Sequence, residues 1–526
     1  MAKKSGAIFV FLGIFLSRIA GLIRERAFAH YFGNSPASDA FKAALRIPNF
    51  LQNLFGEGVL SASFIPIYAK LVADNKKEEA RCLAWLIFTV LVFITSIIVT
   101  VGIFLTPSIV QLIAPGFQED KKLLTIKLVQ IFFPGMGLLV ISAWCLGILN
   151  SHRQFFLSYF APVLWNLSII ASLIYFGQLH GFDLPKLSIY VAWGLFVGCL
   201  LQLLVQIPQT LKLIASIKFS FDLKNEHGQM VIKNFFPILL SRGVVQASAY
   251  IDGIIASFLP TGAVAALSYA QTLYLLPISL FGMSIAASEL PVMSSLSGTP
   301  DDIYVQLKKR LEKSSAQLTF FIIPSVAAFI FLGSEIVSLL FKTGQFSDKD
   351  VQYVWFILIG STLGLLATTQ ARLLSSAFYA LKDGRTPLKI ALVRLFLTAT
   401  LGYLMSIPLI AFLKLPTQLG AVGLTISFGI AGWIEFLLLK HFLSKIIGSY
   451  KISRALYIKA WASAIAAALI ALFAKYSFFI PASFVPEFIA SLLMLFIFGC
   501  LYFLFSYGLK IDEARLVIER ISMKLK

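Results

Sequence analysis

The sequence predicts an all-α protein that crosses a membrane about 14 times. Of its 526 residues, 58% are hydrophobic and only 13% are charged, which is about half the charge of an average soluble protein. The mean hydropathy is +0.86. Apolar runs close to the roughly 20 residues that span a bilayer recur from end to end. The short alternating segments of an outer-membrane β-barrel do not appear in the sequence.

Each expected span is an apolar run bounded by charged or turn-forming residues. The runs cover residues 6–30, 39–69, 82–106, 123–149, 156–178, 187–207, 231–258, 263–296, 314–332, 351–380, 387–412, 419–440, 457–475 and 487–509. The second, eighth and tenth runs are long and contain Pro or Gly, which interrupt or bend helices. The connections are too short to fold as domains of their own.

Positive charge is concentrated in alternate connections between the runs. The net charge is +19, and clusters of Lys and Arg at residues 70–81, 308–313 and 440–459 lie in segments that an even number of spans places on the same side as Lys3 and Lys4. This asymmetry follows the positive-inside rule and predicts that both termini are cytoplasmic. It also explains the positive charge without a nucleic-acid partner.

A faint internal repeat predicts how the spans are grouped. Leu16-Ser17-Arg18 in the first run returns as Leu240-Ser241-Arg242 in the seventh, although chance similarity is the alternative. An offset of six spans predicts two parallel lobes of six helices around a central cavity. The N-terminal lobe would cover residues 1–215 and the C-terminal lobe 216–445. Residues 446–526 would add two helices and a cytoplasmic tail.

A polar stripe runs through the second apolar segment. Its residues recur at steps of three and four, which places them on one face of a helix. They are Asp39, Lys42, Arg46, Asn49, Asn53, Glu57 and Ser61. A membrane helix with this many ionisable groups on one face lines water, a partner helix or a polar ligand. We therefore take Asp39, Arg46, Asn49, Asn53 and Glu57 as candidate substrate-binding residues.

Arginines inside the first span point to an anionic ligand. Arg18 and Arg24 are six residues apart and point about 120° away from each other on a straight helix. A bend at Gly21 would bring them to one cavity. The planar guanidinium is suited to bidentate bonds with phosphate. The alternative is that these arginines reach the interface or pair with Asp39 or Glu57. Arg242 joins the candidates because it repeats Arg18.

Catalytic and cofactor motifs are not found in the sequence. The four cysteines and five histidines have no metal-ligand or redox spacing, and there is no nucleotide-binding loop. We therefore expect a non-enzymatic transporter without cofactors, whose coupling ion is unknown. The arginines that follow the first apolar run argue against a cleavable signal peptide.

The polar residues of the first two spans form a recognisable signature. It comprises Ser17-Arg18, Gly21, Arg24, Gly33, Asp39-Ala40-Phe41, Pro48-Asn49, Glu57-Gly58 and Phe64-Ile65-Pro66, with later matches at Ser268-Tyr269-Ala270, Gly344-Gln345-Phe346 and Thr386-Pro387. In these motifs the chain resembles the MurJ (MviN) family of bacterial lipid II flippases. The resemblance covers about residues 7–440.

The resemblance implies a fold and a set of site residues. The fold is that of the multidrug/oligosaccharidyl-lipid/polysaccharide exporter superfamily, with two further helices bordering a groove for the lipid tail. Family cavity arginines match Arg18 and Arg24, and an acidic family residue matches Asp39. The chain departs from the family at Gln52 and at Gln271-Thr272, where arginine is frequent. Our hypothesis is that Arg242 or Arg46 supplies the missing charge.

The implied function is transport of lipid II, the undecaprenyl-diphosphate-linked muropeptide of peptidoglycan synthesis, to the outer leaflet of the bacterial inner membrane. We expect alternating access, with Arg18, Arg24 and Arg242 holding the diphosphate. Lipid II, membrane lipids and the cell-wall synthesis machinery are the expected partners. The alternatives are an exporter of another polyprenyl-diphosphate glycan, an ion-coupled drug exporter, a membrane enzyme acting on the same lipid, and a scaffold protein.

Overall fold

The computed structural model describes residues 2–51, 54, 60, 63–180, 183–214, 226–231, 233, 250–451, 453–479, 486–516 and 519. All regular secondary structure in these residues is helical, which confirms the predicted fold class. The chain packs into two compact units, Met1–Ala265 with Thr343–Phe346, and Ala266–Lys342 with Ser347–Lys526. The lobe boundary predicted at residues 215 and 216 lies outside the described residues and stays a prediction.

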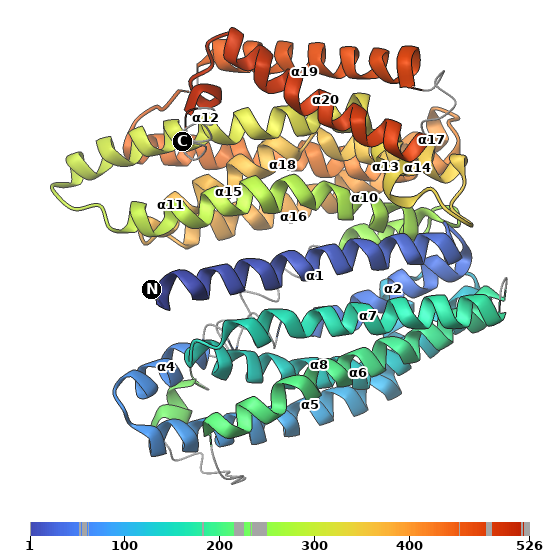
Figure 1. Ribbon diagram of the computed structural model, residues 1–526, viewed down its shortest axis with the longest axis vertical. Coiled ribbons are helices and arrows are strands. Elements are labelled where there is room, and N and C mark those ends of the chain that lie inside the picture. The colour runs from blue at the N-terminus through green and yellow to red at the C-terminus, as the bar shows by residue number, and fades with distance from the viewer. Residues whose placement is uncertain are drawn as a thin grey trace. The chain divides into compact units, whose positions relative to one another are not determined.

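The first unit is a bundle of long helices. They are α1 (Ala2–Phe32), α2 (Pro36–Leu51), α4 (Ile65–Ala73), α5 (Lys77–Ile113), α6 (Glu119–Ser151), α7 (Phe155–His180) and α8 (Leu184–Ile214), followed by a helical turn at residues 250–257. Helices α5, α6, α8 and α7 lie side by side, and α7 also packs against α1 (Figure 1). Helix α2 packs mainly against α6.

Helices α7 and α8 approach each other closely because of two glycines. Gly194 and Gly198 are four residues apart on α8 and face α7. A Cβ atom at Gly194 would lie 1.8 Å from the Ser172 hydroxyl oxygen, and one at Gly198 would lie 2.9 Å from the Trp165 carbonyl oxygen. Small residues at this spacing let membrane helices pack tightly without a hydrophobic driving force. This packing fixes α7, which contributes to the candidate site.

The segment Thr343–Phe346 belongs to the first unit and covers the end of α1. The Gln345 backbone N–H donates to the His30 carbonyl at 2.8 Å, and the His30 ring contacts the Thr343 hydroxyl at 2.8 Å. Gly33 follows α1 with φ +51°, and a Cβ atom there would lie 2.6 Å from the Gln345 carbonyl oxygen. The segment Gly344-Gln345-Phe346, singled out in the sequence, therefore has a packing role.

The second unit contains most of the shorter and interrupted helices. They are α10 (Ala263–Pro277, whose first turn lies in the first unit), the π-helix η2 (Ile278–Met283), α11 (Ser284–Ser294), α12 (Pro300–Phe331), α13 (Gly333–Phe341), α14 (Asp348–Thr362), α15 (Leu365–Ala380), α16 (Arg385–Ser406), α17 (Pro408–Phe412), the 3₁₀-helix η3 (Thr417–Leu419), α18 (Gly420–Ile447), α19 (Arg454–Ala474), the π-helix η4 (Lys475–Phe479) and α20 (Glu487–Gly508).

The starts and interruptions of these helices follow from local residues. Thr299 and Ser347 begin α12 and α14 as capping boxes with Asp302 and Asp350, which satisfy free N–H groups. The predicted tenth span is bent by 44° between α14 and α15, at Gly364. The predicted eighth span changes to a π-helix directly after Pro277. Both interruptions occur in runs that the sequence marked as broken.

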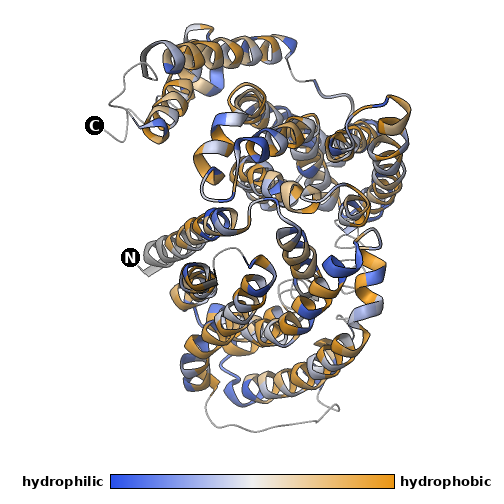
Figure 2. Ribbon diagram, turned by 90° about the vertical axis from the view of Figure 1, so that its right-hand side faces the viewer, coloured by the Kyte–Doolittle hydropathy of each residue, from blue (hydrophilic) through white to orange (hydrophobic). Residues whose placement is uncertain are grey.

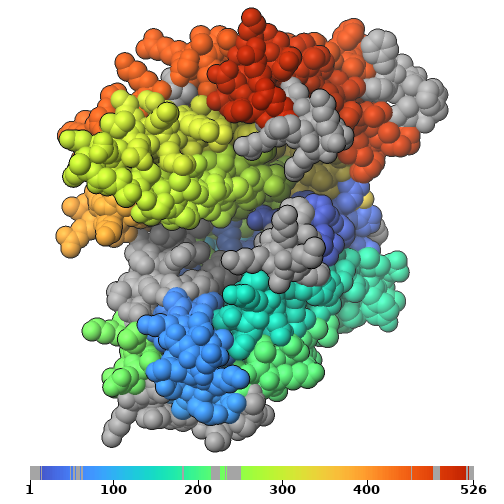
Figure 3. All heavy atoms as spheres, turned by 60° about the vertical axis from the view of Figure 1, so that its left-hand side comes forward, coloured from blue at the N-terminus to red at the C-terminus, as the bar shows by residue number. Residues whose placement is uncertain are grey.

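The two last helices, α19 and α20, form a pair that packs against α12 within the second unit. Alanines on one face of α19, at positions 460, 464, 467, 468 and 471, are fully buried there. Met494, Phe498 and Tyr502 of α20 complete this cluster, and the Tyr502 hydroxyl donates to the Phe320 carbonyl at 2.6 Å. Figure 3 shows the side chains of the pair, in orange and red, directly beside each other.

Ten helices in the described residues are long and apolar enough to cross a membrane, or eleven if α14 and α15 form one bent span. Figure 2 shows the apolar residues in orange along most of their length. The count of 14 is not confirmed. Of the three further predicted spans, α1 has 31 residues and is not among the ten, α2 has only 16 residues, and most of residues 231–258 lie outside the described residues. The protein is a multi-pass membrane protein with an all-helical fold.

Candidate functional site

The candidate site is centred on Arg24, in the C-terminal half of α1. The Arg24 Nη2 atom lies 2.7 Å from Oε1 of the neighbouring Glu25. The other carboxylate oxygen of Glu25 lies 2.5 Å from the Lys42 ammonium of α2. Glu25 and Lys42 are buried, with 9% and 6% of their side chains exposed, whereas Arg24 is 19% exposed. One carboxylate therefore joins two cations from two helices.

Helix α7 positions the guanidinium of Arg24 from the other side. The Arg24 Nη1 atom donates to the Asn166 amide oxygen at 3.1 Å, and the guanidinium lies 4.8 Å from the centre of the Trp165 ring. The Asn166 amide nitrogen donates to the Pro162 carbonyl, one turn earlier, which directs the amide oxygen toward Arg24. A guanidinium has five N–H donors, so donors remain for a ligand.

Asp39 is buried in a different set of contacts. Its carboxylate accepts three hydrogen bonds, from the Lys121 ammonium at 3.0 Å and from the backbone N–H groups of Gly262 at 2.8 Å and Ala265 at 2.9 Å. Only 2% of its side chain is exposed. The backbone donors belong to the first turn of α10, where free N–H groups favour a carboxylate. Asp39 thus anchors the start of that helix.

Arg46 lies against the helical turn at residues 250–257. The Tyr250 hydroxyl donates to the Arg46 carbonyl at 2.5 Å. A Cβ atom on Gly253 would lie 1.6 Å from the Arg46 Nη1 atom, so the guanidinium rests on the glycine backbone. The carboxylate of Asp252 is close enough to stabilise the Arg46 charge. Arg46 therefore has a counter-charge inside the protein.

The other predicted site residues divide into two groups. Arg18 is exposed on α1, which continues as a helix through Gly21, and Asn49 is half-buried on α2. Asn53, Glu57 and Arg242 lie outside the described residues, as does Gln52. The structure brings Arg24 together with Lys42 of the polar stripe, whereas Asp39 and Arg46 take separate partners.

The sequence interpretation missed several partners of these residues. Glu25 adjoins Arg24 and was visible as the one acid among the arginines of the first span. Lys42 was placed in the stripe but was not given a role. Asn166 and Lys121 are 142 and 82 residues from their partners, and no sequence pattern connects them.

A smaller charged cluster lies in the second unit. The Arg394 guanidinium of α16 is 2.5 Å from the Glu435 carboxylate of α18 and 4.6 Å from the centre of the Phe428 ring. The exposed Arg372 of α15 lies within electrostatic range of Arg394. The Arg394–Glu435 pair links α16 to α18, and Arg372 adds a second cation beside it.

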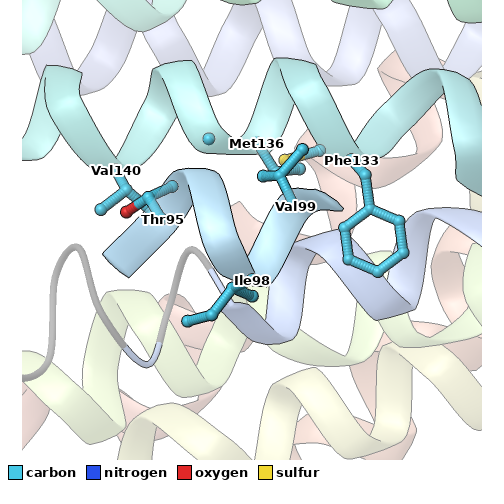
Figure 4. Close-up of a pocket in the computed structure, with 7 residues that line it drawn as sticks. Thr95, Ile98, Val99, Phe133, Met136 and Val140 are labelled. Carbon is cyan, nitrogen blue, oxygen red and sulfur yellow. The ribbon is translucent and has the colours of Figure 1, made fainter. Parts of the chain in front are cut away.

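In the part of the chain that the structure describes, no group of three or more His, Cys, Asp or Glu side chains is placed to hold a metal ion. A small cleft between α5 and α6 is lined by Thr95, Ile98, Val99, Phe133 and Met136, with Gly137 and Val140 (Figure 4). This lining has no ionisable group and does not suit an anionic head group.

Comparison with known proteins assigns the chain to a family. A family model described as "Lipid II flippase MurJ" matches residues 28–499. The chain is 32% identical to a lipid II flippase MurJ of Burkholderia cenocepacia over 434 residues, covering 81% of this chain and 80% of the relative. It is 30% identical to a probable lipid II flippase MurJ of Buchnera aphidicola over 436 residues, covering 82% of each chain.

Solved structures agree with this match. A structure described as "Lipid II flippase MurJ, inward closed conformation" superposes with a TM-score of 0.74 at 26% identity, covering 95% of this chain and 98% of the other. An inward-facing multidrug resistance transporter of the MATE family superposes with a TM-score of 0.65 at 15% identity, covering 81% of this chain and 94% of the other. The second likeness shows a shared fold.

Proposed function

Because this chain belongs to the MurJ lipid II flippase family, we propose that it moves lipid II from the inner to the outer leaflet of the bacterial cytoplasmic membrane. Lipid II carries a diphosphate between its polyprenyl tail and its sugar–peptide head. The observation that supports the proposal is the partly exposed Arg24 guanidinium within a membrane helix, which shares the Glu25 carboxylate with the buried Lys42. Such a group in a membrane segment is costly and marks a ligand pathway.

Arg24 binds the diphosphate in this proposal. Its remaining N–H donors form charge-assisted bonds with phosphate oxygens, while Asn166 and Trp165 hold the guanidinium plane in place. Arg18, exposed on the same helix, and Arg242 extend the positive charge toward the head group. Asn49, Asn53 and Glu57 then face the sugars or peptide. We assign Asp39 and Arg46 to supporting contacts, because each has buried partners of its own.

Transport follows alternating access in this proposal, and the chain acts as a carrier and not as an enzyme. The sequence has no nucleotide-binding loop, so the direction of transport comes from an ion gradient, from the membrane potential or from consumption of lipid II outside. Moving one charge across 100 mV supplies about 2.3 kcal/mol. The positive-inside pattern places both termini in the cytoplasm. The cell-wall synthesis machinery that uses lipid II is the further partner.

The proposal is tested by rescue of a bacterial host depleted of its own flippase. The readout is lipid II exposed at the cell surface. We expect the wild-type chain to restore exposure, Arg24→Ala to abolish it and Arg24→Lys to restore only part, because lysine lacks the planar fork. The matched control is Lys309→Ala, which removes an exposed cation from α12. Wild-type protein that reaches the membrane but leaves lipid II inside would refute the proposal.

The rescue experiment separates the transport and scaffold alternatives, and a second assay on purified protein tests for an enzyme. An exporter of another polyprenyl-diphosphate glycan, or a cation-coupled drug exporter, would not restore surface lipid II. A scaffold would restore growth without changing the exposed fraction. A membrane enzyme would convert lipid II when the purified protein is incubated with it, whereas the transporter leaves the lipid chemically intact.

A further inference from the structure

The carboxylate of Glu25 is shared between two cations that differ in burial. Arg24 reaches one carboxylate oxygen at 2.7 Å and Lys42 reaches the other at 2.5 Å. Lys42 has 6% of its side chain exposed, and its ammonium lies 4.5 Å from the centre of the Phe28 ring. Arg24 is three times as exposed. Lys42 is therefore the inner cation and Arg24 the outer one.

This arrangement determines the net positive charge that the site presents to a ligand. An isolated Arg24–Glu25 pair would be neutral, and an incoming anion would have to compete with the carboxylate for the guanidinium. With Lys42 present, the three side chains carry one net positive charge. Because Lys42 is nearly inaccessible, that charge is presented through Arg24. Arg46 belongs to a separate group, in which Asp252 stabilises its charge.

We propose that Lys42 is a positioning residue for transport: it neutralises Glu25 from inside the protein, so that Arg24 keeps a net positive charge for the diphosphate. This inference rests on the proposed function, because it names the residue that makes the same site cationic. Lys42 itself does not contact the ligand. Its effect passes through Glu25 to Arg24.

A purely structural role for the Lys42–Glu25 pair makes different predictions. Breaking a buried ion pair from either side destabilises a protein, so Lys42→Met and Glu25→Gln would then lower stability and weaken ligand binding together. The charge-balance role predicts opposite changes in binding. Lys42→Met leaves a neutral Arg24–Glu25 pair, whereas Glu25→Gln leaves two cations without the acid.

The test measures binding of lipid II to purified full-length protein in detergent, together with the thermal unfolding midpoint of each variant. We expect Lys42→Met to weaken binding about tenfold, the loss of roughly one charge-assisted interaction. Glu25→Gln should bind as tightly as wild type or more tightly, even if its midpoint falls. The double variant Lys42→Met/Glu25→Gln, in which Arg24 is the remaining charge, should recover most of the wild-type affinity. Lys42→Arg should bind lipid II as tightly as wild type.

Two results would overturn the inference: Lys42→Met binding as tightly as wild type, or both single variants weakening binding to the same extent. A second probe, inorganic pyrophosphate, separates this outcome from failure of the proposed function. Wild-type protein that binds pyrophosphate but not lipid II would refute the proposed substrate, while opposite shifts of the two variants toward pyrophosphate would still support the charge balance. Wild-type protein that binds neither probe would refute both.

Discussion

Replacing Asp39 by Asn tests whether this residue anchors the fold or contacts the substrate. The substitution keeps the shape of the side chain but removes its charge and one of its two acceptor oxygens. In the structure, the carboxylate accepts a bond from Lys121 and two from the backbone of Gly262 and Ala265. All three hydrogen bonds of the carboxylate are therefore made within the first unit.

The expected cost follows from those contacts. Lys121 is only 10% exposed and would keep the Thr261 hydroxyl at 3.3 Å and the Phe117 ring at 4.7 Å, neither of which neutralises it. Removing one partner of a buried ion pair costs about 3–5 kcal/mol. Since 1 kcal/mol shifts the midpoint of a unit of this size by about 2–4 °C, we expect a fall of roughly 10 °C.

The assay is thermal unfolding of detergent-solubilised protein, followed by tryptophan fluorescence, with lipid II binding measured at a temperature where the variant is folded. The double variant Asp39→Asn/Lys121→Met should recover part of the midpoint, because no unpaired charge remains. Asp120→Asn is the control, since Asp120 is exposed. An unchanged midpoint combined with lost lipid II binding would show that Asp39 acts on the substrate, against this reasoning.

Three further predictions concern stability. Lys475→Met should lower the unfolding midpoint more than Lys475→Met/Glu335→Gln, because the single variant leaves the buried Glu335 carboxylate unpaired. Hydrogen bonds from Thr386 hold the pKa of Asp383, in the turn before α16, below its ordinary value of 3.8. The contribution of Asp383 to the free energy of unfolding is therefore present above that pH and is lost as the pH falls through its lower folded-state pKa. When stability is measured against pH, Asp383→Asn should lack this loss. Gly33→Ala should destabilise the end of α1 by about 1–3 kcal/mol in chemical unfolding, because φ is +51° and the methyl would clash.

Local features of the fold were predictable because they depend on nearby residues. Apolar length predicted the helices, and Gly and Pro residues marked the eighth and tenth runs as broken. The structure has a π-helix after Pro277 in the eighth run and a 44° bend after α14 in the tenth. The number of spans could not be fixed in the same way. Helix α2 has only 16 residues, shorter than the roughly 20 that span a bilayer, and most of residues 231–258 lie outside the described residues.

The candidate site was predictable only in part, because ion pairing between helices depends on tertiary packing. The spacing of the stripe predicted that it lines water, a partner helix or a polar ligand, and Lys42 and Asp39 are buried against other helices. It did not predict that their partners are Glu25 and Lys121. Glu25 could have been predicted as the partner, because it is the one acid of the first span and adjoins Arg24. Lys121 follows the loop after α5, and no neighbouring residue indicates that it has a buried partner.

Three charged residues of the polar stripe, all on α2, make separate contacts within the first unit. Lys42 pairs with α1, Asp39 pairs with α6 and caps α10, and Arg46 faces the helical turn at residues 250–257. Asp39 is paired with Lys121 inside the first unit, whereas two cations share the one acid Glu25. In the proposal above, Arg24 on α1 presents the surplus charge of this group, and Lys42 acts on a ligand by leaving that charge unbalanced.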